Sequence, residues 1–116
     1  MPEGRRRRVL LGVFEPMVLI GMNRMLSDAG VEVLDKALPE ERLVAAAARL
    51  RPDAVVVGFA GSDLMLTGER VRAAAPGAKV IFCAPDEIRV LDPGGTVLRH
   101  ISAPVDDQLC TEVLGT

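Results

Sequence analysis

The chain has 116 residues, and its 14 Lys and Arg against 16 Asp and Glu leave a formal charge of -2. Hydrophobic residues make up 49% and charged residues 26% of it, a balance that excludes intrinsic disorder for the bulk and predicts one packed domain. No apolar run approaches the roughly 20 residues of a membrane-spanning helix. We therefore expect a cytoplasmic protein with no membrane partner.

Cysteine and histidine are too few and too scattered for a metal site. The two cysteines, Cys83 and Cys110, lack the close spacing of zinc ligands, and His100 is the only histidine. A chain of this length buries enough surface to fold without disulfides. The sequence therefore predicts two reduced thiols, no metal and no cofactor.

Residues 1–8 carry four consecutive arginines and are predicted to form a basic flexible leader to a domain over residues 9–116. A run of four is shorter than the basic tracts that bind nucleic acid. The chain also has no Trp or Tyr and only three Phe, so it lacks the aromatic side chains on which bases stack. We therefore do not expect nucleic acid as a partner.

From residue 9 onward, short apolar runs alternate with longer amphipathic stretches. Proline or acidic residues begin these stretches, and Gly30, Pro52 and Pro76 follow their ends. The pattern predicts helices over 16–29, 39–50 and 64–75, between strands at 9–13, 31–34, 53–58 and 78–83. Connections of this length are crossovers, so we expect a parallel sheet with helices on both faces.

The alternation breaks after Cys83. Two β-type runs, 88–91 and 96–101, flank Asp92-Pro93-Gly94-Gly95, which is typical of a turn. Proline and paired glycines would end any helix begun at Asp86 after about one and a half turns. A fourth helix is therefore predicted to be shortened or replaced by a hairpin, and residues 104–114 to form a closing helix.

Five short phrases occur along the chain in this order: Glu15-Pro16, Asp28-Ala29-Gly30-Val31-Glu32-Val33, Leu50-Arg51-Pro52-Asp53, Ala75-Pro76-Gly77-Ala78-Lys79-Val80-Ile81 and Ala103-Pro104-Val105-Asp106. Together they resemble the receiver domain of two-component response regulators, and the resemblance runs from Arg8 to Val113. It implies a flavodoxin-like, doubly wound, five-stranded parallel sheet with a pocket at the carboxyl ends of its strands.

The residues that carry receiver chemistry are missing. The positions of the Mg²⁺-binding acidic pair fall on Val13 and Phe14, and the phosphate-accepting Asp falls on Gly58. The family's Thr or Ser falls on Cys83 and its Lys on Ala103. Because Mg²⁺ needs oxygen ligands and an acyl phosphate needs a carboxylate, we expect no Mg²⁺ binding, no phosphorylation and no enzymatic activity.

Two alternatives stay open at this pocket. An acid displaced along the chain, Asp63 above all, would restore phosphorylation only if its geometry were very exact. A small ligand is the second alternative, and it would lie in the crevice between Val13, Phe14, Gly58, Phe59, Cys83 and Ala103. Cobalamin-binding domains share the architecture, but Val18 stands where their metal-ligating His is found.

The predicted first helix is apolar on more than one side. Val18, Met22, Met25 and Ala29 are expected to face the sheet, which leaves Met17, Leu19 and Ile20 as surplus. Such a Met-rich surface is adaptable and suits a partner helix or a second copy of the chain. The hairpin region adds Val90 and Val97 as partner-binding candidates.

These observations predict an atypical, phosphorylation-independent signalling module that acts through a protein partner or as a homodimer. The alternative is a small-molecule sensor that uses the strand-end crevice. Regulation follows from the resemblance alone, since a fold does not determine a function.

Overall fold

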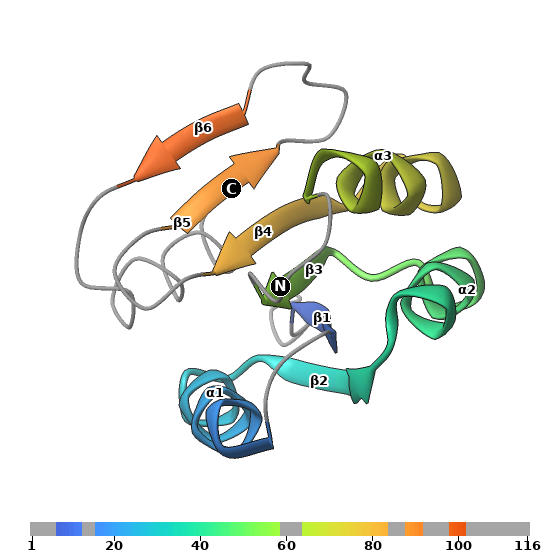
Figure 1. Cartoon of the computed structure of the whole chain (residues 1–116). Coiled ribbons are helices and arrows are strands. Elements are labelled where there is room, and N and C mark those ends of the chain that lie inside the picture. Colours follow the sequence, from blue (N-terminus) through green and yellow to red (C-terminus); the bar gives the residue numbers. More distant parts are fainter. Residues whose placement is uncertain (1–6, 13–15, 59–63, 84–87, 92–97, 102–116) are drawn as a thin grey trace, which may run out of the picture.

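A computed structural model describes residues 7–12, 16–58, 64–83, 88–91 and 98–101 (Figure 1). The residues outside these ranges include the predicted turn at 92–95 and the predicted closing helix at 104–114. The described helices are α1 (Pro16–Asp28), α2 (Glu40–Leu50) and α3 (Leu64–Ala74). The strands are β1 (Arg8–Gly12), β2 (Glu32–Leu38), β3 (Ala54–Gly58), β4 (Lys79–Cys83), β5 (Ile88–Leu91) and β6 (Leu98–Ile101).

The described strands form one mixed sheet in the order β2-β1-β3-β4-β5-β6. The first four are parallel, as the alternation of apolar runs and helices predicts. β5 lies antiparallel to β4, and β6 antiparallel to β5. The fold is thus consistent with a flavodoxin-like sheet, but the expectation of a five-stranded, fully parallel sheet was wrong.

The reversal at β5 has a simple geometric cause. Only residues 84–87 separate Cys83 from Ile88, whereas a crossover to a parallel neighbour needs a dozen or more residues. The chain must therefore turn back, and Cys83 pairs with Ile88 across the two strands. The predicted replacement of a fourth helix by a strand pair is confirmed, because β6 in turn pairs antiparallel with β5.

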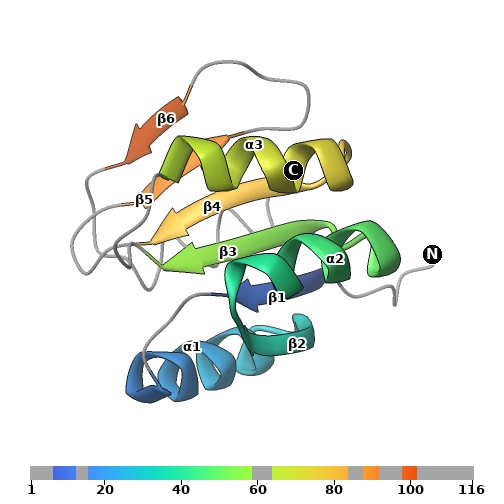
Figure 2. The ribbon, with the colours of Figure 1, turned by 45° about the vertical axis from the view of Figure 1, so that its right-hand side comes forward.

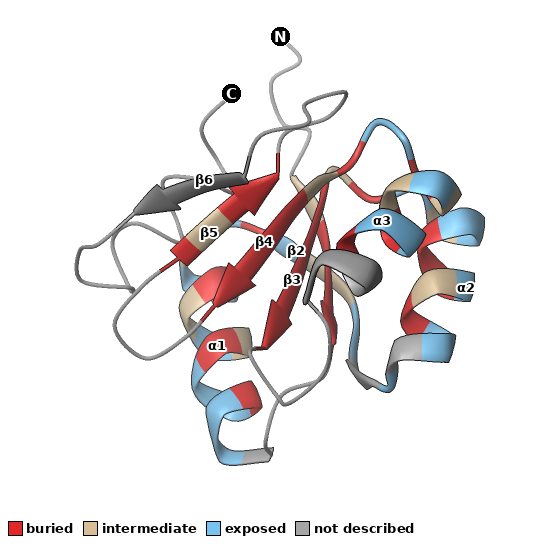
Figure 3. Cartoon of the chain, turned by 45° about the horizontal axis from the view of Figure 1, so that its top comes forward, coloured by how far each residue is buried: buried red, intermediate tan, exposed pale blue. Residues whose placement is uncertain are grey.

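Helices cover both faces of the sheet (Figures 1 and 2). α2 and α3 lie side by side on one face, and α1 lies on the other face near β2. Each face has its own buried cluster, with Leu11, Val56 and Ile81 on the α1 side and Leu10, Val55 and Phe82 on the opposite side. Neighbouring residues of a strand alternate between the two clusters, which is the two-residue period of a strand buried on both faces. β3 is accordingly buried along its whole length (Figure 3).

Arg8 ties the start of the sheet to the end of α2. Its backbone N–H donates to Asp53 Oδ2 at 2.8 Å, and its guanidinium donates to the carbonyl oxygens of Leu50 at 3.0 Å and Arg51 at 3.5 Å. The last carbonyls of a helix have no partner within the helix, so the arginine satisfies groups that would otherwise need water. β1 accordingly begins at Arg8, one residue before the apolar run.

α2 ends without a glycine. Arg51 adopts the left-handed conformation, with φ 48° and ψ 64°, and its N–H donates to the Ala47 carbonyl. The following Pro52 explains the stop, because proline disfavours a helical conformation in the residue before it. Among the described residues, no helix is long and apolar enough to cross a membrane.

Candidate functional site

The carboxyl ends of β1, β3 and β4 lie at the same edge of the sheet, where parallel α/β folds place their ligands. Gly12 pairs with Val57, and Gly58 pairs with Cys83, so the two site residues predicted on β3 and β4 are direct neighbours. Both are buried. Val13, Phe14, Phe59 and Ala103, the other residues predicted for this pocket, lie outside the described residues.

One side of this edge is closely packed by α2. A Cβ atom added to Gly12 would lie 2.7 Å from Leu43 Cδ2 and 2.9 Å from Cδ1, and Leu43 is itself fully buried. Helix and strand can approach this closely only because position 12 has no side chain. The α2 side of the β1 terminus is therefore occupied by Leu43.

The side chains described at this edge offer little chemistry. Gly58 supplies only backbone, and the thiol of Cys83 is the one polar side-chain group of the Gly58–Cys83 pair. Among the described residues, no three His, Cys, Asp or Glu side chains lie close enough to hold a metal ion. Asp63, the displaced acid considered from the sequence, lies outside the described residues.

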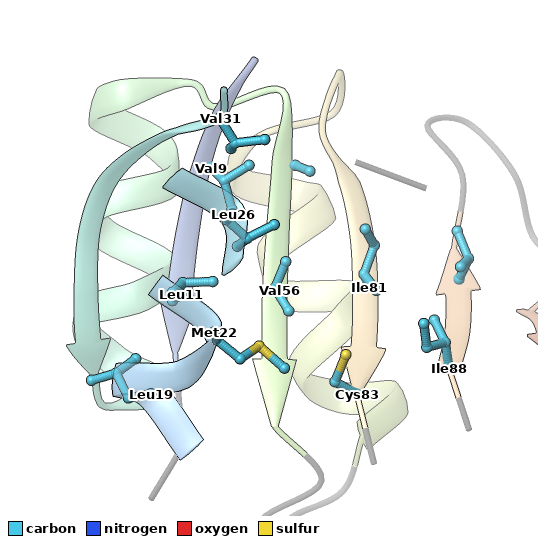
Figure 4. Close-up of a cluster of buried hydrophobic side chains, with 12 residues drawn as sticks. Val9, Leu11, Leu19, Met22, Leu26, Val31, Val56, Ile81, Cys83 and Ile88 are labelled. Atoms are coloured by element: carbon cyan, nitrogen blue, oxygen red, sulfur yellow. The ribbon is translucent and has the colours of Figure 1, made fainter. Parts of the chain in front are cut away.

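Cys83 is held as a neutral thiol. Its side chain belongs to the cluster on the α1 side of the sheet, beside Ile81 and Ile88, and only 4% of the residue is exposed (Figure 4). Burial raises the pKa of the Cys83 thiol from its ordinary value of 9.0 to about 12. Since the thiolate is the reactive form, we expect Cys83 to react slowly with alkylating reagents in the folded protein.

This raised pKa predicts an alkaline loss of stability. More than one pH unit below its ordinary pKa of 9.0 the thiol is protonated in both states and contributes almost no pH dependence. As the pH rises further, the unfolded chain releases the proton while the folded chain keeps it. The free energy of unfolding should then fall by about 2 kcal/mol between pH 9 and about 10.5.

Urea denaturation of the wild type and of Cys83→Ala over this pH range measures the effect. The chain has no tyrosine to titrate in the same window. We expect the alanine variant to be less stable at pH 8 but to show a shallower alkaline slope. Parallel slopes in the two proteins would contradict a buried, protonated Cys83.

Exposed apolar side chains gather at the start of α1. Among the residues whose burial the structure describes, the large hydrophobic side chains that are exposed are Met17 at 85%, Ile20 at 69% and Val18 at 47%. Met17 and Ile20 are two of the predicted partner-binding residues. All three lie in the first five residues of α1 (Figure 3).

Two of the other partner-binding candidates are buried rather than exposed. Leu19 is buried against the sheet, and Val90 on β5 is fully buried in the same cluster, so listing them as surface residues was wrong. Val97 lies outside the described residues.

The face of α1 that packs on the sheet was predicted correctly at Met22, and Met25 and Ala29 are partly buried, but the prediction was wrong at Val18, which is 47% exposed. The residues of α1 that are buried are Leu19, Met22 and Leu26 (Figure 4). This spacing of three and four residues is itself a valid helical stripe. The sequence contains two apolar stripes on this helix, and the one that contains Leu19 joins the buried cluster of Leu11 and Val56.

Neither the protein-family models nor the curated proteins include a match to this chain. The fold is similar to the crystal structure of the anti-anti-sigma factor PhyR from Bartonella quintana, with a TM-score of 0.58 and 16% sequence identity. The match covers 69% of this chain and 34% of PhyR, about a third of that protein's length. The likeness fits a receiver-like fold, and at this identity it concerns the fold alone.

Proposed function

We propose that the chain is a degenerate receiver-like module that regulates through protein–protein contact or self-association and needs no phosphoryl transfer. The observation that carries the interaction is the grouping of Met17, Val18 and Ile20 on the exposed start of α1. A soluble domain rarely leaves such a group uncovered unless the surface meets a partner. PhyR, whose fold is similar, is an anti-anti-sigma factor, and we infer regulation by binding here too.

Independence from phosphorylation rests on the end of β3. Gly58 occupies the position that the receiver resemblance assigns to the phosphate-accepting Asp, and its neighbour Cys83 occupies that of the Thr or Ser. A glycine has no carboxylate to form an acyl phosphate. The proposal therefore includes a non-catalytic role that needs no Mg²⁺. It also includes a location in the cytoplasm, which is the expectation from the sequence.

Native mass spectrometry of the chain before and after incubation with Mg²⁺ and acetyl phosphate tests this function. We expect no change in mass, while a phosphorylatable receiver treated in parallel gains one phosphoryl group. A phosphoryl adduct on this chain would overturn the proposed function, and peptide mapping would then locate the acceptor, with Asp63 as the first residue to examine.

A further inference from the structure

The solvent-facing side of α1 forms a continuous stripe. Successive helical residues are about 100° apart, so positions spaced by three, four and seven share a side. Met17, Ile20, Gly21, Arg24 and Asp28 have this spacing, and all five are exposed. They lie opposite Leu19, Met22 and Leu26, which pack on the sheet. We call these five residues the outer stripe of α1.

The charges on the outer stripe oppose the dipole of their own helix. The first turn of α1 contains no acidic residue and the last turn no basic one, although a helix favours acids at its start and bases at its end. Asp28 instead stands at the negative end of the helix. Its partner Arg24, 3.9 Å away, precedes it by one turn, which is the less favourable order for such a pair.

We propose that the outer stripe of α1 binds the same stripe of a second copy of this chain, as an antiparallel pair of helices about a two-fold axis. With the axis near Ile20 and Gly21, such pairing places Asp28 of each copy just beyond the N-terminal end of the other α1, which begins at Pro16, and the dipole favours a negative charge there. The unfavourable charge pattern within one chain thus becomes complementary between two. This inference rests on the proposed interaction function and specifies its partner.

The shape of the stripe supports the same arrangement. Ile20 is 69% exposed, and beside it Gly21 leaves open space, since a Cβ atom added there would meet nothing within 4 Å. A two-fold axis between these positions lays Ile20 of one copy over Gly21 of the other, like a knob in a hole. Met17 then packs on the aliphatic part of the Arg24 side chain in the other copy. The guanidinium group can stay in water, because the methylene groups of an arginine can be buried while its charged end is solvated.

The contact is small. A stable dimer usually buries about 800 Å² on each partner, and the outer stripe of one helix provides less. We therefore expect a weak, concentration-dependent dimer, detectable below about 1 mM protein. A weak interface also suits a regulatory contact that forms and separates.

Sedimentation velocity over a concentration series tests the pairing. We expect Ile20→Asp to raise the dimer dissociation constant at least tenfold, and Ala48→Asp, which places the same charge on an exposed position of α2, to leave it unchanged. Gly21→Leu should also weaken the dimer at least tenfold. Because leucine is a far better helix former than glycine, this variant should keep or raise the melting temperature, which separates lost contact from lost fold.

Disulfide trapping distinguishes the antiparallel register. In a Cys110→Ser background, Ile20→Cys lies next to the two-fold axis and should cross-link to itself under mild oxidation. Met17→Cys lies away from the axis and should not, whereas a parallel pair would cross-link at both positions. The buried native thiol of Cys83 is not expected to compete.

Three results would overturn the inference: a monomer at every concentration up to about 1 mM, a dimer that tolerates Ile20→Asp, or equal cross-linking at both positions. None of them bears on the phosphodonor experiment. A strictly monomeric chain that stays unmodified by acetyl phosphate would remove the second copy as partner and leave the proposed function standing.

Discussion

Replacing Gly58 with Asp should lower the free energy of unfolding by roughly 4 kcal/mol at pH 7 and should not create a phosphorylation site. Gly58 is buried at the end of β3, and its strand partner Cys83 presents a neutral thiol. Among the described residues at this edge of the sheet, Gly58 pairs with Cys83, and Gly12 pairs with Val57 on the neighbouring strands. None of these partners carries a positive charge. An introduced carboxylate would lose its hydration there without gaining a charged partner.

Gly58→Asn is the matched control, since it adds a side chain of the same size without the charge. We expect it to lower the free energy of unfolding by about half as much. Burial should raise the pKa of the introduced carboxyl, so the unfolded variant releases its proton above about pH 4 while the folded variant retains it. The gap between the two variants should therefore widen as the pH rises from 4 to 7.

The same variant tests what the resemblance implies about the rest of the site. An acyl phosphate forms with Mg²⁺ held by further carboxylates, and those positions are Val13 and Phe14 in this sequence. Treatment of Gly58→Asp with Mg²⁺ and acetyl phosphate should thus leave its mass unchanged. A stable variant that gains a phosphoryl group would contradict this prediction. It would show that the missing acceptor carboxylate is the only reason why the natural sequence is not phosphorylated at this site.

Replacing Phe82 with Ala should cost about 3–5 kcal/mol and should reverse the effect of a second substitution at Gly68. Phe82 lies on β4 and is fully buried. It belongs to the buried cluster on the side of the sheet that α2 and α3 cover. A Cβ atom added to Gly68 of α3 would lie 2.8 Å from Phe82 Cζ. The glycine therefore allows α3 to pack directly on the ring.

Two effects compete in Gly68→Ala. Alanine in a helix interior gains about 1 kcal/mol over glycine, whereas overpacking a core costs about 1–3 kcal/mol. Because the ring of Phe82 is rigid and enclosed, we expect the clash to dominate and the variant to be destabilised. In a Phe82→Ala background the ring is gone, and Gly68→Ala should then be stabilising.

A double-mutant cycle of these variants by urea denaturation measures the coupling, which we expect to be about 2 kcal/mol. If Phe82→Ala is too unstable to fold, Phe82→Leu provides a milder version of the same cycle. The same sign of effect for Gly68→Ala in both backgrounds would contradict the close packing of α3 on Phe82.

Most residues of the candidate site could be predicted only because the sequence resembles receiver domains. The resemblance assigns Gly58 and Cys83 to related positions, and the register then shows that they are direct partners. The sequence missed Gly21, since an isolated glycine in a helix carries no sign of whether the space beside it is filled. The exposed positions of Met17 and Ile20 were confirmed, because both lie off the stripe that packs on the sheet.

The four parallel strands and the three helices between them could be predicted from local signals in the sequence. Apolar runs, proline at helix starts and glycine or proline after helix ends are local signals, and the length of each connection imposes a crossover. The sequence also predicted the strand pair after Cys83 from local turn residues, Pro93 and the glycines that follow.

The direction of β5 and the rotation of α1 depend on contacts between distant elements and could not be predicted from local signals. The direction of β5 depends on which strand it joins, and pairing with β4 across a four-residue connection requires reversal. The rotation of α1 was undetermined because Val18 and Leu19 are similarly apolar and each belongs to a helical stripe. Leu19 is buried in the cluster that contains Leu11 and Val56, and Met17 and Ile20 are left at the surface.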